Sequence, residues 1–165
     1  MGEWNFEEYR LKINQTAAVQ ERQIVFQELA ERVLSRRTSN EDTIMEMMKM
    51  QLVDCSYQEK SVTLRFPVMS WQINPIGTLH GGISATAADD TGGLLTQMVT
   101  MTGVTPTVYL NTSYLSPVKR GDNLIVKAKI ERAGKRLVHV HVEGRSEATG
   151  EMAITAMATY MPIYD

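Results

Sequence analysis

The sequence predicts an α+β fold in which one antiparallel sheet packs around a single long helix. Three observations predict it. Residues 83–101 form a run without proline that is rich in Ala, Leu and Met, which is typical of a buried helix. The segments on both sides of this run alternate apolar and polar residues, which is typical of strands. The gaps between successive strands are too short for crossover helices, so neighbouring strands are expected to be antiparallel.

Two strands are expected before the long helix and four after it. Residues 50–56 and 61–68 flank a polar turn at 58–60, a pattern that predicts a hairpin. The four later strands are separated by short turns that contain glycine or charged residues. They cover residues 105–115, 123–133, 136–147 and 152–163. One helix against one sheet makes a two-layer domain.

Residues 1–45 are expected to form an N-terminal helical extension, and residues 46–165 the domain itself. A helix is predicted over residues 3–37, because apolar residues recur there at the spacing of one helical face. These residues are Phe26, Leu29, Ala30, Val33 and Leu34. The segment 39–42 resembles a capping box and predicts a further short helix over 41–48.

Composition narrows the class of protein. A length of 165 residues with 43% hydrophobic content indicates one domain with a substantial core. The net charge of −2 argues against a general nucleic-acid-binding protein. The single cysteine, Cys55, excludes an internal disulfide and favours a reducing compartment. The N-terminus lacks the basic-then-apolar pattern of a secretory signal, and no run is long enough to span a bilayer, so a cytoplasmic location is expected.

The loop Asn74-Pro-Ile-Gly-Thr-Leu-His80-Gly81-Gly82 leads into the long helix. Two glycines at a helix start leave backbone N–H groups uncovered at the positive end of the helix dipole. Such donors bind an anion, or an oxygen that becomes anionic during a reaction. Asp89 then places a carboxylate in an otherwise small and apolar stretch. An oxyanion site together with a carboxylate favours acyl transfer or hydrolysis.

Helical geometry predicts that this site needs two chains. Nine residues at about 100° each place Asp89 about half a turn away from His80. A symmetric dimer would solve this, with Gly81 of one chain facing Asp89 of the other. Gly92 and Gly93 destabilise a helix by on the order of 1 kcal/mol each relative to alanine. We interpret them as admitting a second helix at close range, which fits a dimer.

Other chemistries are disfavoured. His139 and His141 share one strand face, but no cysteine or carboxylate nearby completes a metal site. Cys55 has no histidine partner in sequence and is expected to be an inert core thiol. The sequence contains no Gly-x-Ser-x-Gly elbow, phosphate loop or dinucleotide fingerprint. We therefore expect neither a metal nor a redox cofactor.

The pattern Asn74-x-x-Gly77-x-x-His80-Gly81-Gly82 with Asp89 resembles the hotdog-fold acyl-CoA thioesterases of the phenylacetyl-CoA thioesterase type. The similarity covers roughly residues 50–163 and includes the segment Asn111-Thr-Ser-Tyr-Leu-Ser-Pro117. It implies the hotdog fold, with the sheet wrapped around the central helix. It also implies a hydrolase that converts an acyl-CoA thioester to free acid and coenzyme A, built as a homodimer that commonly pairs into a homotetramer.

The resemblance also implies roles for individual residues. Asp89 would act as general base or nucleophile, and the N–H of Gly81 would donate to the thioester oxygen. His80 and Asn74 would shape the site, and Thr107 would position the water.

The resemblance and the basic turns together predict the coenzyme A contacts. Cations at an exposed rim suit its phosphates, although solvated turn charges are the simpler interpretation of the basic residues. The expected contacts are Gly82, Ser116, Pro117, Lys119, Arg132, Lys135 and Arg136.

Three questions stay open at this point. Asp90, next to Asp89, is expected to be a solvated or paired charge, but the doublet leaves open which carboxylate acts. A hotdog hydratase or dehydratase would instead use His80 with a carboxylate to move protons at carbon. A non-catalytic acyl-CoA-binding module would keep the pocket without turnover.

Overall fold

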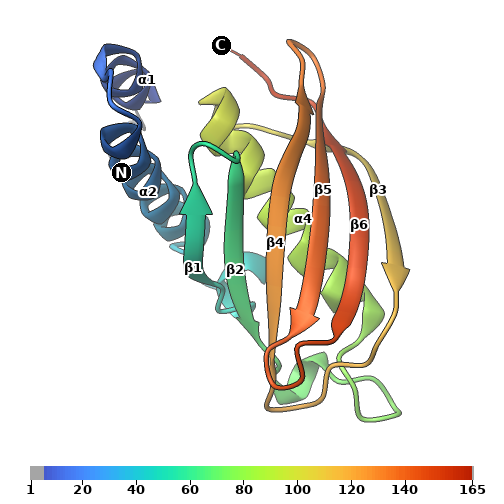
Figure 1. Ribbon diagram of the computed structural model, residues 1–165. Helices are drawn as coiled ribbons and strands as arrows, with labels where there is room; N and C mark the ends of the chain where they lie inside the picture. The colour runs from blue at the N-terminus through green and yellow to red at the C-terminus, as the bar shows by residue number, and fades with distance from the viewer. Residues whose placement is uncertain (1–5, 165) are drawn as a thin grey trace.

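The computed structural model describes residues 6–164 and has the predicted α+β architecture. A six-stranded antiparallel sheet, in the order β1-β2-β4-β5-β6-β3, wraps around the long helix α4 (Figure 1). The strands are β1 (Gln51–Ser56), β2 (Ser61–Pro67), β3 (Thr107–Tyr114), β4 (Asn123–Ala133), β5 (Val138–Ser146) and β6 (Met152–Tyr160). The predicted strands are therefore confirmed, with ends that differ by at most three residues.

Helix α4 (Gly81–Thr100) forms the centre of the core. Its residues Ala87, Leu94, Leu95 and Met98 are fully buried. Side chains that alternate along each strand cover them from the sheet, which is the pattern expected when one face of a sheet is buried. The helix ends at Met101, which adopts a left-handed conformation with φ 55°.

The N-terminal extension contains two longer helices where the sequence predicted one. Helix α1 (Phe6–Gln15) and helix α2 (Val19–Arg37) are separated at residues 16–18, and residues 3–5 of the predicted helix lie outside the described part. At the end of α1, the backbone N–H and the hydroxyl of Thr16 both donate to the carbonyl of Lys12. This residue therefore closes the last turn of α1.

The short third helix begins later than the sequence predicted. Helix α3 (Ile44–Met47) is capped by Thr43, whose hydroxyl accepts the backbone N–H of Glu46. Ser39 does not cap it, because its hydroxyl donates to the carbonyl of Arg36 and so closes the end of α2. The capping sequence is therefore Thr43-x-x-Glu46, four residues beyond the predicted one.

Helix α2 is part of the core. Its residues Phe26, Leu29, Ala30 and Val33 are buried in the same cluster as α4 and the sheet, as their spacing predicted. It contacts both β1 and α4. Within residues 6–164, no helix is both long and apolar enough to cross a membrane.

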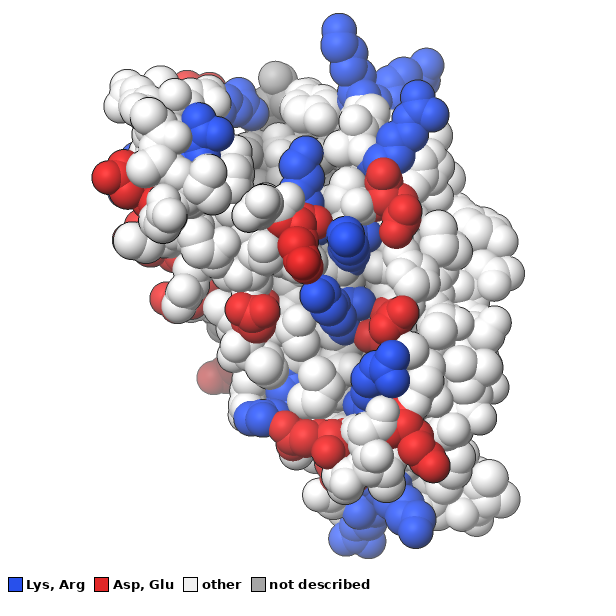
Figure 2. Space-filling view, in the orientation of Figure 1, with Lys and Arg blue, Asp and Glu red and all other residues white. Residues whose placement is uncertain are grey.

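The outer face of the sheet divides into two halves (Figure 2). Over β2, β4 and β5, charged side chains alternate in sign and form ion pairs such as Lys127–Glu59 and Arg145–Glu143. Strands β6 and β3 contain no charged residue. β3 is also one of the two edge strands of the sheet, and among residues 6–164 its only strand partner is β6.

Candidate active site

The start of α4 leaves one backbone donor free. His80 is the N-cap, and its Nδ1 accepts the N–H of Gly82 at 3.0 Å. The carbonyl of His80 accepts the N–H groups of Ile83 and Ser84 at 2.9 and 3.0 Å. The N–H of Gly81 has no hydrogen-bond partner among residues 6–164. A Cβ on Gly82 would lie 3.1 Å from the His80 Nδ1, so glycine at this position leaves room for the cap.

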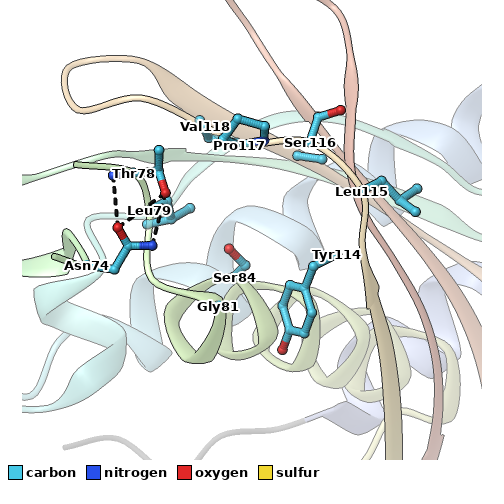
Figure 3. A pocket seen from close by; sticks show the side chains of 11 residues that line it. Asn74, Thr78, Leu79, Gly81, Ser84, Tyr114, Leu115, Ser116, Pro117 and Val118 are labelled. Atoms are coloured by element: carbon cyan, nitrogen blue, oxygen red, sulfur yellow. Dashed lines mark hydrogen bonds between the residues drawn. The ribbon is translucent and has the colours of Figure 1, made fainter. Parts of the chain in front are cut away.

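Asn74 builds the loop that leads into α4. Its Oδ1 accepts the backbone N–H groups of Ile76 and Thr78 at 3.2 and 3.1 Å, and its amide lies 2.9 Å from the Thr78 hydroxyl (Figure 3). Gly77 turns the chain with φ 81°, a conformation that favours glycine. Asn74 therefore acts through the shape of the loop that positions His80 and Gly81.

A cavity of about 270 Å³ opens beside Gly81 (Figure 3). The ring of Tyr114, at the end of β3, packs against this glycine and would meet a Cβ there at 3.3 Å. Two of the predicted coenzyme A contacts, Ser116 and Pro117, line the cavity together with Asn74. The remaining wall combines apolar and hydroxyl side chains: Leu79, Leu115, Val118, Ala153, Thr78 and Ser84.

Asp89 lies two turns further along α4 and faces β3 and β6. Its half-buried carboxylate accepts a hydrogen bond on Oδ1 from the Thr107 hydroxyl at 2.8 Å. The Tyr160 hydroxyl lies 2.9 Å from the Asp89 carbonyl oxygen and 3.2 Å from Oδ1, and donates its proton to one of them. No residue in the described range hydrogen-bonds to Oδ2. One carboxylate oxygen is thus anchored and the other is available to a reactant.

Tyr160 serves Asp89 as a neutral donor. Burial raises the pKa of its hydroxyl, and the negative charge of Asp89 raises that pKa further. Asp89 therefore accepts from two neutral hydroxyl groups, those of Thr107 and Tyr160.

Asp90 faces the other way, toward α2. Its side chain is 6% exposed, and its Oδ1 lies 3.5 Å from Nη2 of Arg37. Nη1 of Arg37 donates to the Asp90 carbonyl oxygen at 3.1 Å. Burial raises the pKa of the Asp90 carboxyl to about 6, Arg37 opposes this shift, and Asp89 adds to it. The sequence predicted that Asp90 is either solvated or paired, and the structure shows that it is paired with Arg37.

Gly92 and Gly93 face side chains of their own chain. A Cβ on Gly92 would overlap the Tyr160 hydroxyl, and a Cβ on Gly93 would lie 3.4 Å from both terminal nitrogens of Arg37. Both glycines are buried in a single chain. The interpretation that they admit a helix of a second copy is therefore wrong, because the space is already filled.

Within a single chain, the predicted site residues lie in separate groups. Gly81 and its cavity lie at the start of α4, and Asp89 with Thr107 lies at its middle. Lys119 lies next to the loop, bridged to Thr78. The other basic residues lie in or beside the β4–β5 hairpin, at the opposite end of the sheet (Figure 1). They are Arg132, Lys135 and Arg136.

Sequence reasoning missed Tyr160, Tyr114 and Arg37. A signal for Tyr160 was present, because the inward positions of β6 are otherwise small or aliphatic and a buried tyrosine hydroxyl needs a partner. No local pattern marks Arg37, which resembles any cation at the end of a helix. The buried Cys55 agrees with the prediction of an inert thiol, since burial raises its pKa to about 11.

Part of the chain is similar to known thioesterases. Residues 76–153 match the model of the thioesterase superfamily. Acyl-coenzyme A thioesterase 13 of Homo sapiens is 38% identical over 81 residues, which are 48% of this chain and 56% of that protein. The chain thus spans about half the length of the curated relatives it matches.

Solved structures agree on the fold. The crystal structure of thioesterase superfamily member 2 from Mus musculus has a TM-score of 0.69 and 26% identity, and covers 82% of this chain and 96% of its own. The PaaI protein from the phenylacetic acid degradation operon of E. coli has a TM-score of 0.72 at 15% identity, over 83% of this chain and 95% of its own. The fold is therefore the hotdog fold. Over residues 76–153, the chain is similar to the thioesterase superfamily.

Proposed function

We propose that this chain hydrolyses an acyl-CoA thioester to free acid and coenzyme A. The observation that carries the proposal is the half-buried Asp89 carboxylate, which Thr107 anchors on one oxygen and leaves free on the other. The similarity to a protein named acyl-coenzyme A thioesterase supports the choice of substrate class.

In the proposed reaction, the free N–H of Gly81 stabilises the oxygen of the thioester carbonyl as it becomes negative. One such donor contributes about 2.7–4 kcal/mol to transition-state stabilisation. If Asp89 is the general base, it takes a proton from the attacking water, the bond between carbon and sulfur breaks, and the leaving thiolate of coenzyme A takes up that proton. If Asp89 is the nucleophile, its attack on the carbonyl breaks the bond between carbon and sulfur and expels the thiolate, which takes a proton from solvent. Water then hydrolyses the resulting anhydride and releases the acid and Asp89.

The proposed site is made by two chains that pair through β3. Thr107, at one end of this strand, contacts Asp89, and Tyr114, at the other end, packs on Gly81. If β3 pairs antiparallel with β3 of a second copy, Thr107 lies opposite Tyr114 of the partner. Asp89 of one chain then comes beside Gly81 of the other.

The character of β3 supports this pairing. It is an eight-residue edge strand without charges, and Val108 and Tyr109 are more than half exposed on it. Long uncharged edges invite pairing with another chain, and natural monomers block them. A homodimer is therefore part of the proposal, and two such dimers would form the homotetramer that the resemblance implies.

The proposed coenzyme A site lies at the rim of the Gly81 cavity, next to Gly82. Lys119 lies beside this rim in the same chain, because it forms a β-bridge with Thr78, which lines the cavity. In a two-chain site, Arg132, Lys135 and Arg136 would reach the substrate from the other chain. Alanine at Lys119 and at the three hairpin positions, measured as two separate variants, shows which group contributes to KM.

Hydrolysis is favoured over the hydratase alternative by the state of His80. Its Nδ1 accepts the N–H of Gly82, so this nitrogen is engaged in the helix cap. A hydratase would instead use His80 with a carboxylate to move protons at carbon. His80 serves instead as the cap that leaves the Gly81 donor free.

A hydrolysis screen tests the proposal. Short, medium, long and aromatic acyl-CoAs are incubated with the protein, and released thiol is measured. We expect turnover that depends on Asp89. Binding of acyl-CoA without release of thiol would replace the proposal with a binding module, and water addition to an enoyl thioester would replace it with a hydratase.

A further inference from the structure

We infer that Arg37, the last residue of α2, is a positioning residue for Asp89 and acts through Asp90. The inference rests on the proposed role of Asp89 and assigns a task in the reaction to the N-terminal helical extension. Arg37 touches neither Asp89 nor the Gly81 cavity through any hydrogen bond of the described residues, and it would act by holding α4.

The two glycines of α4 expose the backbone on which Arg37 acts. In an α-helix, the carbonyl of residue i lies beside residues i+3 and i+4. Gly92 therefore uncovers the carbonyl of Asp89, and Gly93 uncovers that of Asp90. Tyr160 reaches the first at 2.9 Å from β6, and Arg37 reaches the second at 3.1 Å from α2.

These two contacts hold the same turn of α4 from different sides. Consecutive helical residues point about 100° apart, so any rotation of the helix moves Asp89 and Asp90 together. Arg37 donates a hydrogen bond to the carbonyl oxygen of Asp90 and forms an ion pair with its carboxylate. By fixing Asp90 it fixes the rotation that keeps Asp89 at 2.8 Å from the Thr107 hydroxyl.

Stability alone does not explain why this ion pair is buried. Burial raises the pKa of Asp90 to about 6 and lowers the pKa of Arg37, so each group is pushed toward its neutral form. Oδ2 of Asp90 is buried and has no hydrogen-bond partner among the described residues. Apolar residues of similar size often replace such pairs without loss of stability. A positioning role accounts for an arrangement that the fold does not need.

Helix α2 can transmit this restraint because it is anchored. Phe26, Leu29, Ala30 and Val33 are buried in the common core, so the end of the helix is fixed relative to the sheet. The contacts of Arg37 with α4 therefore hold Asp89 in a fixed position relative to the sheet that carries Thr107 and Tyr160.

The test replaces the pair with apolar residues. Arg37→Met combined with Asp90→Leu should keep the fold, the oligomeric state and an unfolding midpoint at or above that of the wild type. With the acyl-CoA that the wild type hydrolyses fastest, kcat should fall by about 10- to 100-fold, because small misplacements of a catalytic group have effects of that size. KM should not change, since binding contacts are untouched. The matched control is Lys127→Met with Glu59→Leu, an exposed pair on the outer sheet face, which should leave kcat unchanged.

Arg37→Lys gives a second measurement that does not depend on the double variant folding. Lysine keeps the charge but has one side-chain nitrogen, whereas arginine has two terminal nitrogens. Lysine therefore cannot contact the carbonyl oxygen and the carboxylate of Asp90 as arginine does. Its kcat should lie between those of the wild type and the double variant. A folded double variant with wild-type kcat would overturn the inference, as would wild-type kcat in Arg37→Lys if the double variant does not fold. A wild type without hydrolysis would remove the proposed function, whereas these results in an active wild type remove the positioning role alone.

Discussion

Asp89 and Asp90 are adjacent in sequence, but α4 places them in opposite settings. Asp89 lies on the face toward β3 and β6, where hydroxyl groups hold one carboxylate oxygen and leave the other free. Asp90 lies on the face toward α2, 5% exposed and paired with Arg37. The comparison teaches that the helix face, and not the residue type, decides which carboxylate can meet a reactant and which one can only support it.

The largest expected effect distinguishes the role of Asp89 in hydrolysis from that of Asp90. Asp89→Asn keeps the size of the side chain and removes the base, so hydrolysis should fall by about 10²- to 10⁴-fold with little change in KM. Asp90→Asn should lower the activity of the folded protein far less. Steady-state kinetics with acyl-CoA, together with circular dichroism of both variants, check this. Loss of turnover in Asp90→Asn with an active Asp89→Asn would reverse the comparison.

The next effect isolates the oxyanion donor. Gly81 is the first residue of α4, where proline is well tolerated, and Gly81→Pro removes its N–H. The preceding residue, His80, already has the extended ψ of 134° that a following proline requires. Turnover should fall by about 10²- to 10³-fold.

Gly81→Ala is the matched control for this variant. Its Cβ meets the Tyr114 ring as a proline ring would, but the N–H remains. We expect it to retain most of the activity. Equal losses in the two variants would show that crowding by Tyr114, and not the donor, matters at this position.

The buried carboxylate should make stability depend on pH. The raised pKa of Asp90, about 6 against an unperturbed 3.8, means that the folded state binds this proton more tightly than the unfolded state. The free energy of unfolding should therefore fall as pH rises from about 4 to about 6, and the Asp90 carboxyl should contribute about 3 kcal/mol to this fall. Urea unfolding of the wild type and of Asp90→Asn across this range measures the difference. Parallel curves for the two proteins would show that Asp90 does not titrate there.

The two glycines should respond unequally to alanine. At Gly92 the new Cβ overlaps the Tyr160 hydroxyl, so overpacking should cost about 1–3 kcal/mol and lower kcat by moving Tyr160 off Asp89. At Gly93 the Cβ meets Arg37 at ordinary contact distance, and better helix propensity offsets the crowding by up to about 1 kcal/mol. Thermal unfolding and kcat of both variants check the difference, and equal responses would contradict it.

Local patterns predicted the frame of the site. The loop from Asn74 to Gly82 predicted a helix start with uncovered donors, because the effect of glycine acts over a few residues. The structure leaves the Gly81 N–H free, whereas His80 caps that of Gly82, which was not predicted. The place of Thr107 in the site followed only from the family resemblance, and its hydrogen bond to Asp89 was not predicted. Tyr160 and Arg37 act on residues 71 and 53 positions away, and no local pattern carries such contacts. For the same reason Gly92 and Gly93 were assigned to a second chain, although their neighbours come from their own.

Mixing two inactive variants tests the two-chain site most directly. Asp89→Asn and Gly81→Pro each remove one half of the site, and chains refolded together form mixed dimers. If Asp89 of one chain works with Gly81 of the other, each mixed dimer contains one intact site, and the mixture should recover about a quarter of the wild-type activity. If mass spectrometry shows mixed dimers but no activity returns, the two groups do not act across chains, and the shared active site is contradicted.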